Sequence, residues 1–215
     1  MSDDCKRILV MLVVLASVAA SAARGTDAVP SEDVETQLKE VNTRFTYKGE
    51  AIHPLAVQDL MASDGDMHPG PVAIELEGTY HSNRYFGKYK REKDGSITIE
   101  TTQNAPGLLE GERYYFRYKH LGTLANGYHV LQTWDYGGGG TGVFTNLLLV
   151  KFTIDFEYTE GDAHRSRLLM LRMAELGLGD RYNGEIKVEP HAITIGSWNR
   201  PGDSVAEPSR VIKFD

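Results

Sequence analysis

Apolar and polar residues alternate along most of the chain after residue 70, which is the pattern of β-strands. The clearest case is the segment 146–158, where Leu148, Val150 and Phe152 share one face. At about 3.3 Å per residue this strand would span roughly 40 Å, so it needs long partner strands. Further strands are expected over 72–77, 85–92, 96–102, 112–119, 128–136, 185–189, 192–196 and 210–214.

The segment before residue 70 mixes helical and strand periodicity. Ser31 is placed to cap a short helix whose apolar stripe begins at Val34, and Pro54 opens a second helical turn. Between these two elements the side chains of Val41, Thr43, Phe45 and Tyr47 alternate with polar residues. The alternation predicts a half-buried strand over 41–48.

The segment 165–176 fits two structures. Its Leu, Met, Arg, Ala and Glu content favours a helix by intrinsic propensity. However, its connection to the strand 146–158 has the length of a hairpin loop, and that long strand would otherwise expose a row of backbone donors and acceptors. We therefore expect a strand here, with a helix as the alternative.

Short turns between successive strands determine the expected fold class. Asp94-Gly95 and Asn126-Gly127 are both tight-hairpin signals. They predict a mainly β fold, a single antiparallel meander closed as a barrel or folded as a β-sandwich, with one or two short peripheral helices. The expected organisation is a signal peptide over 1–22, an acidic lead-in with a short helix over 23–40, and one β-rich domain over 41–215.

The amino terminus indicates export. An uninterrupted run of apolar and small residues covers 8–20, follows Lys6 and Arg7, and ends in the small-residue pattern Ala20-Ser21-Ala22. Its length fits the core of a signal peptide, because a membrane-spanning helix needs roughly 20 apolar residues. Two acidic residues near the start leave an uncleaved anchor as the alternative. We expect cleavage after Ala22, a periplasmic or extracellular protein, and no membrane span after cleavage.

Composition and motifs exclude several classes of protein. The chain of 215 residues has a formal net charge of -7, whereas a nucleic-acid-binding protein needs an excess of basic residues, so no such partner is expected. The single cysteine, Cys5, rules out a disulfide framework. No zinc, phosphate-loop or Gly-x-Ser-x-Gly spacing occurs, so neither a metal nor a cofactor is expected. His53 and His120 are expected to lie solvated in turns or at strand ends.

The best candidates for ligand binding are aromatic side chains beside a glycine loop. Strand alternation places three of them on one face, and a tetraglycine follows the last one. Glycines leave room for a ligand and allow a loop to close, and aromatic rings stack on apolar or sugar-like molecules. The residues expected to line this site are Tyr128, Trp134, Tyr136, Gly137, Gly138, Gly139 and Gly140.

The function expected from these features is that of an exported, non-catalytic binding or envelope-associated protein. Its partner would be a small apolar or sugar-like ligand or a component of the envelope. The alternative is a hydrolase or lyase with dispersed acid–base residues, for which His129, Asp135 and Glu157 are the candidates. An aromatic-lined cavity would favour binding, and titratable groups converging in one pocket would favour an enzyme.

Overall fold

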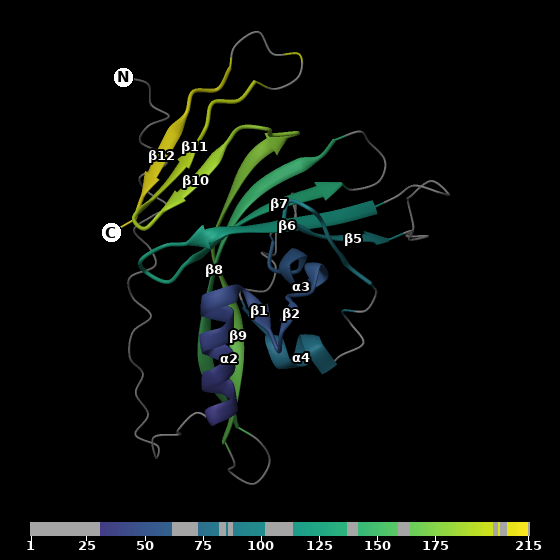
Figure 1. Cartoon of the computed structure of the whole chain (residues 1–215), viewed down its shortest axis with the longest axis vertical. Coiled ribbons are helices and arrows are strands. Elements are labelled where there is room, and N and C mark those ends of the chain that lie inside the picture. Colours follow the sequence, from purple (N-terminus) through teal and green to yellow (C-terminus); the bar gives the residue numbers. More distant parts are fainter. Residues whose placement is uncertain are drawn as a thin grey trace.

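The computed structural model describes residues 31–61, 73–81, 85, 88–101, 114–136, 142–158, 164–199, 202 and 206–214. Strands account for 55% of the structure and helices for 16%, so the fold is mainly β, as predicted. Seven antiparallel strands form one curled sheet, shaped like half a barrel, in the order β3-β9-β8-β7-β6-β5-β4 (Figure 1). The expected signal peptide and the tetraglycine lie outside the described residues.

Successive hairpins build the curled sheet. The longest hairpin joins β8 and β9, which pair from Phe144 opposite Asp180 to Tyr158 opposite His164. The segment 165–176 is therefore a strand, because β8 needs a partner of its own length for its backbone groups. The strands of the sheet are β3 (Ala73–Glu75), β4 (Lys90–Arg91), β5 (Ile97–Thr101), β6 (Tyr114–Thr123), β7 (His129–Tyr136), β8 (Phe144–Tyr158) and β9 (His164–Asp180).

Irregular pairing along β9 accounts for the bend of this hairpin. The register with β8 shifts at two places, where Met173 and Leu178 are inserted without partners. Such bulges bend a strand and increase its local twist. One end of β8 and β9 therefore belongs to the curl, and the other end extends as a narrow arm (Figure 1).

Three helices among the described residues cover one face of the sheet, called the inner face below: α2 (Glu32–Arg44), α3 (Pro54–Gln58) and α4 (Leu76–His81). As predicted, Ser31 caps α2 by accepting the N–H of Val34 at 3.4 Å. The predicted strand over 41–48 is wrong, because α2 continues to Arg44. Val41 fits the helical spacing of α2 as well as the alternation of apolar and polar residues that predicted a strand. Within 41–48, only the two residues of β1 (Thr46–Tyr47) form a strand. No described helix is long and apolar enough to cross a membrane.

Two other predicted strands are shorter than expected. In the segment 72–77, pairing with β9 stops at Glu75, and the chain enters α4 at Leu76, which is buried in the core. In the segment 85–92, β4 (Lys90–Arg91) is the part of the described backbone that pairs with β5 as a strand. Burial of side chains against the helical layer, in place of strand pairing, explains both differences.

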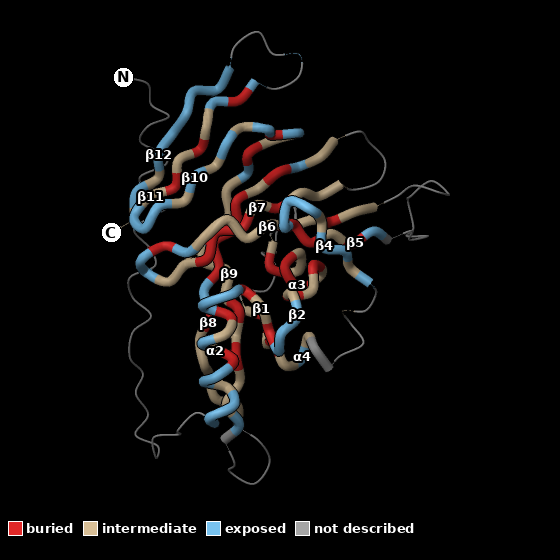
Figure 2. The backbone as a smooth tube through the Cα atoms, in the orientation of Figure 1, coloured by how far each residue is buried: buried red, intermediate tan, exposed pale blue. Residues whose placement is uncertain are grey.

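Buried side chains form a core on each side of the sheet. The first lies between the inner face and the helices, and the second lies between the opposite, outer face and a separate three-stranded sheet. The side chains of β8 alternate between the two cores, since Leu148 and Val150 belong to the first and Leu147 and Leu149 to the second. Buried stretches run along the middle strands of the curled sheet (Figure 2). The separate sheet consists of β10 (Ile186–Glu189), β11 (Ala192–Ile195) and β12 (Arg210–Lys213), all strands that the sequence predicts.

Candidate functional site

A cavity of about 120 Å³ lies in the layer that covers the inner face. Its described lining residues come from the segment 47–89, and they combine aromatic rings with a carboxylate. None of the lining residues that the structure describes is a lysine or an arginine. The cavity is lined by Tyr47, Glu50, Ala51, Ile52, His53, Leu76, Thr79, Tyr85 and Tyr89.

A tight hairpin presents the first wall of the cavity. Lys48 and Gly49 join β1 to β2 (Glu50–Ala51) with φ values of 51° and 78°, the left-handed pair that a type I′ turn requires. Glu40 of α2 holds this hairpin, because its carboxylate accepts the Gly49 N–H at 2.7 Å. The pairing of β1 with β2 then sets Tyr47 opposite Glu50 at the cavity.

The second wall is the start of α3. His53 is the N-cap of this helix, and its Nδ1 atom accepts the Leu55 N–H at 3.3 Å, which assigns the proton of the neutral ring to Nε2. The hydroxyl of Tyr118 on β6 donates to the carbonyl of Ile52 at 2.6 Å. This bond ties the wall to the sheet behind it.

The three tyrosines at the cavity all donate their hydroxyl protons to carboxylates. A charge-assisted bond of this kind is stronger than a neutral one, so it fixes each ring in place. Burial, together with the bonded carboxylate, raises the pKa of both Tyr47 and Tyr89, which keeps these phenols neutral donors. The three pairs are Tyr89 with Glu50 at 3.0 Å, Tyr85 with Asp59 at 2.8 Å, and Tyr47 with Glu77.

The electrostatic character of the cavity suits a positive charge. Glu50 lines it and is exposed, so its charge is accessible to an incoming ligand. The faces of phenol rings carry negative electrostatic potential and attract cations. Tyr47 already shows this behaviour within the protein, because the Lys48 ammonium lies 5.4 Å from the centre of its ring.

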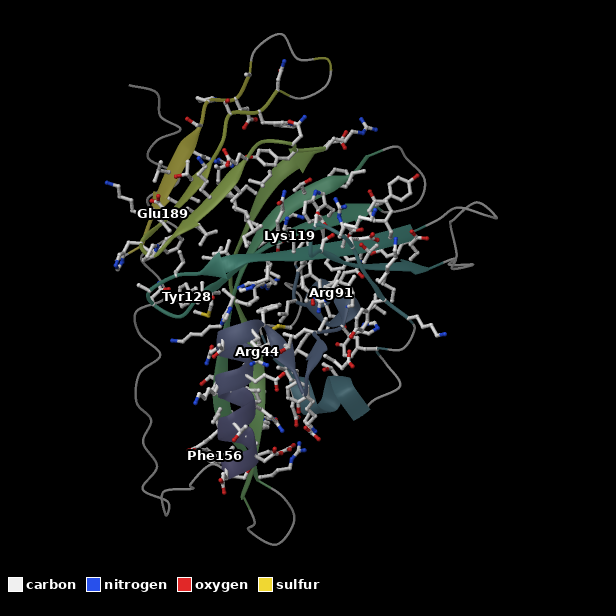
Figure 3. The ribbon with its side chains drawn as sticks, in the orientation of Figure 1. Arg44, Arg91, Lys119, Tyr128, Phe156 and Glu189 are labelled. Carbon is white, nitrogen blue, oxygen red and sulfur yellow. The ribbon has the colours of Figure 1, made fainter. Side chains whose placement is uncertain are left out.

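The aromatic residues predicted to bind a ligand lie elsewhere, on β7 and at the turn before it. The Arg117 guanidinium lies over Trp134 at 4.0 Å from the ring centre, and Tyr136 stacks on Tyr115 at 5.3 Å. Tyr128 lies at the β6–β7 turn (Figure 3) and packs against the second core. Six strand positions separate it from Trp134, a distance of roughly 20 Å.

Trp134 and Tyr136 thus lie close together, whereas Tyr128 lies away from both. The glycines at 137–140 belong to the part of the chain that the structure does not describe. The predicted site on β7 remains a prediction, and the cavity on the inner side is a separate candidate that the sequence reasoning missed.

The candidate acid–base residues are dispersed in the fold. Asp135 and His129 lie on β7, opposite Phe144 and Val150 of β8. Glu157 lies on β8 itself, seven residues beyond Val150. Burial raises the pKa of the Asp135 carboxyl. However, Asp135 lies beside the start of β8, and Glu157 lies near the end of that strand. These three residues therefore do not form one site.

A histidine pair, with His129 buried and His120 half-buried, connects α2 with the inner face. Nδ1 of His129 lies 3.2 Å from Nε2 of His120. Nε2 of His129 lies 3.3 Å from Oδ1 of Asn42 in α2. Burial lowers the pKa of both rings, that of His129 to about 4, so the pair is neutral at pH 7. The expectation that His53 and His120 lie solvated is wrong: His53 caps α3 and lines the cavity, and His120 stacks on Phe45 at 4.7 Å.

Comparison with protein-family models, curated proteins and solved structures finds no match. Within the described residues, no group of three or more His, Cys, Asp or Glu side chains is arranged to hold a metal ion. The functional interpretation therefore depends on the geometry of the cavity.

Proposed function

We propose that this protein is a non-catalytic binding protein and that the tyrosine-lined cavity takes a small organic cation. The observation that carries the proposal is the composition of the cavity wall. It combines three tyrosine rings, an imidazole and the Glu50 carboxylate, and the lining residues described include no lysine or arginine. Aromatic faces and a carboxylate attract a cation together, and they leave an anion without a donor of positive charge.

The size of the cavity limits the ligand. Its volume of about 120 Å³ is close to the roughly 150 Å³ of a cavity that binds one benzene molecule. A single ammonium headgroup or the tip of a side chain fits this space. A whole sugar ring with its hydroxyl groups is a poorer match, so the cavity favours a cationic ligand over a sugar-like one.

The polar groups of the cavity favour binding over catalysis. The Thr79 hydroxyl donates to the carbonyl of Leu76 at 2.7 Å, and the Tyr89 hydroxyl donates to Glu50. A nucleophilic hydroxyl would instead need a base that accepts its proton and can hold it. Here Thr79 donates to a backbone carbonyl, which cannot act as that base.

Titration of the full-length chain with choline chloride and ethanolamine chloride tests the proposal. Isothermal calorimetry at constant ionic strength should detect binding of at least one of these cations. Tyr89→Leu removes a ring and Glu50→Gln removes the charge, so each should weaken binding by about fivefold or more.

Tyr136→Leu is the matched control, because it removes a stacked tyrosine from β7 and leaves the cavity unchanged. Its affinity for the cations should equal that of the parent chain. Loss of binding in Tyr136→Leu with full binding in Tyr89→Leu would overturn the cavity proposal and favour the site predicted on β7. Absence of binding of both cations to the parent chain would also overturn the proposal.

We also propose export, on the basis of the apolar run at 8–20 and the small residues that follow it. Intact mass of the protein isolated from its native cell envelope should correspond to a chain that begins at Ala23. A protein that still begins at Met1 or Ser2, or that stays in the cytoplasm, would contradict the proposal.

A further inference from the structure

We infer that a second cavity, between the start of α2 and β9, binds a free α-amino acid with a small aliphatic side chain. This cavity, called the charged cavity below, has a volume of about 200 Å³. It shares no described lining residue with the tyrosine-lined cavity, and its ligand belongs to a different class. The charged cavity is lined by Asp33, Val34, Gln37, Glu77, Arg165, Ser166, Arg167 and Leu168.

Helix α2 and strand β9 form the two main walls of the charged cavity. The helix lies along the arm made by β8 and β9 (Figure 1). At the start of the helix the Ser31 N–H donates to Oγ of Ser166 at 3.1 Å, and the Ser166 hydroxyl donates to Oγ of Ser31 at 3.3 Å. These two hydrogen bonds hold the wall that carries Asp33 against the wall that carries Arg165 and Arg167.

Two arginines supply the positive charge of the cavity wall. Arg165 and Arg167 are alternate residues of β9, so their side chains leave the strand on the same face. Arg165 donates through Nε and Nη2 to Glu157 and through Nη2 to Glu75. Arg167 donates through the same two atoms to Asp155. Nη1 of each arginine makes no hydrogen bond with a described residue, so its N–H groups remain available for a ligand carboxylate.

The acceptors of the cavity wall lie on α2. Gln37 is 5% exposed, and its Nε2 donates to Oδ2 of Asp33 at 2.8 Å. Within the described part of the chain, Oε1 of Gln37 and Oδ1 of Asp33 accept no hydrogen bond. The other carboxylate, Glu77, already accepts from Tyr47 and pairs with Lys48. An ammonium group has three N–H donors, so it can satisfy the free oxygens of Gln37 and Asp33 together.

The balance of charge favours a zwitterion over a simple ion. The described lining residues include two carboxylates and two guanidinium groups. A ligand with one positive charge is repelled by the arginines, and a ligand with one negative charge is repelled by the carboxylates. An α-amino acid carries an ammonium and a carboxylate on the same carbon atom, so it can pair with both sides of the wall.

The remaining lining residues and the volume limit the side chain of the ligand. Val34 and Leu168 are the apolar residues of the wall, and they favour contact with an aliphatic group. The volume of about 200 Å³ exceeds the roughly 150 Å³ of a cavity that binds one benzene molecule. This space suits an amino acid with a small aliphatic side chain.

Three ligands with the same aliphatic group test the inference on the full-length chain. L-Valine carries both charges, isobutylamine lacks the carboxylate, and 3-methylbutanoate lacks the ammonium. Isothermal calorimetry at pH 7 and constant ionic strength should show L-valine binding about tenfold more tightly than either of the other two. An affinity for L-valine no higher than that for the better of the two single ions would overturn the inference.

Two variants report on the two sides of the wall. Asp33→Asn keeps an acceptor for Gln37 and removes the negative charge, so it should weaken binding of L-valine by about fivefold or more without weakening that of 3-methylbutanoate. Arg167→Gln should weaken L-valine by a similar factor without weakening isobutylamine. Glu35→Gln, which removes an exposed carboxylate of α2 outside the cavity, is the matched control and should bind like the parent chain. Parent-like affinity for L-valine in both Asp33→Asn and Arg167→Gln would refute the assigned site.

A further variant separates this site from the proposed cation site, because L-valine also carries an ammonium group. Glu50→Gln should weaken binding of choline and ethanolamine and leave the affinity for L-valine unchanged. Loss of L-valine binding in Glu50→Gln, with full binding in Asp33→Asn, would place the amino acid in the tyrosine-lined cavity and overturn the inference. Absence of choline and ethanolamine binding, together with the expected L-valine pattern, would overturn the proposed function and support the charged cavity.

Discussion

Lowering the pH from 7 to 4 should destabilise the folded chain through His129. This side chain has no exposed surface, and burial together with the nearby His120 lowers the pKa of its imidazole from 6.5 to about 4. The unfolded chain therefore binds a proton between pH 6.5 and about 4 that the folded chain does not bind. The contribution of His129 to stability is complete above pH 6.5 and is lost as the pH falls toward 4.

The size of this effect follows from the pKa difference. One pKa unit corresponds to about 1.4 kcal/mol, so the shift of His129 predicts a loss of about 3 kcal/mol in the free energy of unfolding across this range. That is a large fraction of the stability of an ordinary domain. The helix α2 should be affected first, because Asn42 contacts the ring directly.

Urea unfolding at a series of pH values between 7.5 and 4 measures the effect. His129→Leu keeps the site apolar and removes the proton-binding group. Between pH 7.5 and 4 the free energy of unfolding of this variant should therefore decrease by about 3 kcal/mol less than that of the parent chain. His191→Gln, which changes an exposed histidine, serves as the control and should follow the parent curve. Parallel curves for the parent chain and His129→Leu would refute the reasoning.

Three further predictions concern the sheet and the hairpin, each measured as a change in the free energy of unfolding in urea. Phe152→Ala removes a ring from the first core and should cost about 3 to 5 kcal/mol. Lys151→Ala changes an exposed side chain of the same strand and should cost less than about 1 kcal/mol. Similar costs for the two variants would contradict the assigned inner face. Gly49→Ala should cost about 1 to 2 kcal/mol because φ is 78°, whereas Gly78→Ala in α4 should be neutral or stabilising; an unaffected Gly49→Ala would argue against the type I′ turn. Trp134→Ala should cost about 1 to 2 kcal/mol, because this ring is half-buried under Arg117; a loss above about 3 kcal/mol would assign Trp134 to a core.

Alternation and turn chemistry predicted most of the sheet. The strand over 146–158 appears as β8 with its apolar face inward, and the turns at Asp94-Gly95 and Asn126-Gly127 each join two paired strands. The segment 165–176 shows the limit of local propensity, because its composition favours a helix and its pairing with β8 makes it a strand. The pairing requirement of a neighbouring strand was the better guide.

The same local reasoning failed between residues 41 and 92. Val41 fits both a helical and an alternating pattern, and only the packing of α2 on β8 and β9 decides between them. In the segment 85–92 the apolar and polar alternation is real, but Tyr85 and Tyr89 bury their rings beside the cavity. The turn at Lys48-Gly49 was the available signal for a hairpin here, since glycine supports a left-handed backbone.

The cavity could not be predicted from spacing because its members come from different kinds of element. Tyr47 and Glu50 lie on a hairpin of two short strands, His53 caps a helix, and Tyr85 and Tyr89 lie between α4 and β4. No single periodicity therefore relates them. The tyrosine–carboxylate bonds within the segment 47–89 fix the rings, and two contacts from outside this segment fix the elements that carry them. Glu40 of α2 fixes the hairpin, and Tyr118 of the sheet fixes the start of α3.

One of the two outside contacts comes from the helical layer, through Glu40, and the other comes from the sheet, through Tyr118. Glu40 holds the β1–β2 hairpin through Thr46 and Gly49, and it lies on the same helix as Asn42, which contacts the buried His129. Any loosening of α2 from the inner face would therefore act on the hairpin that carries Tyr47 and Glu50. Protonation of His129 disfavours the docked position of α2, because a charged imidazole is poorly tolerated in a buried site. Acid stability and the proposed cation binding should thus be linked through one helix, and a lower pH should weaken both.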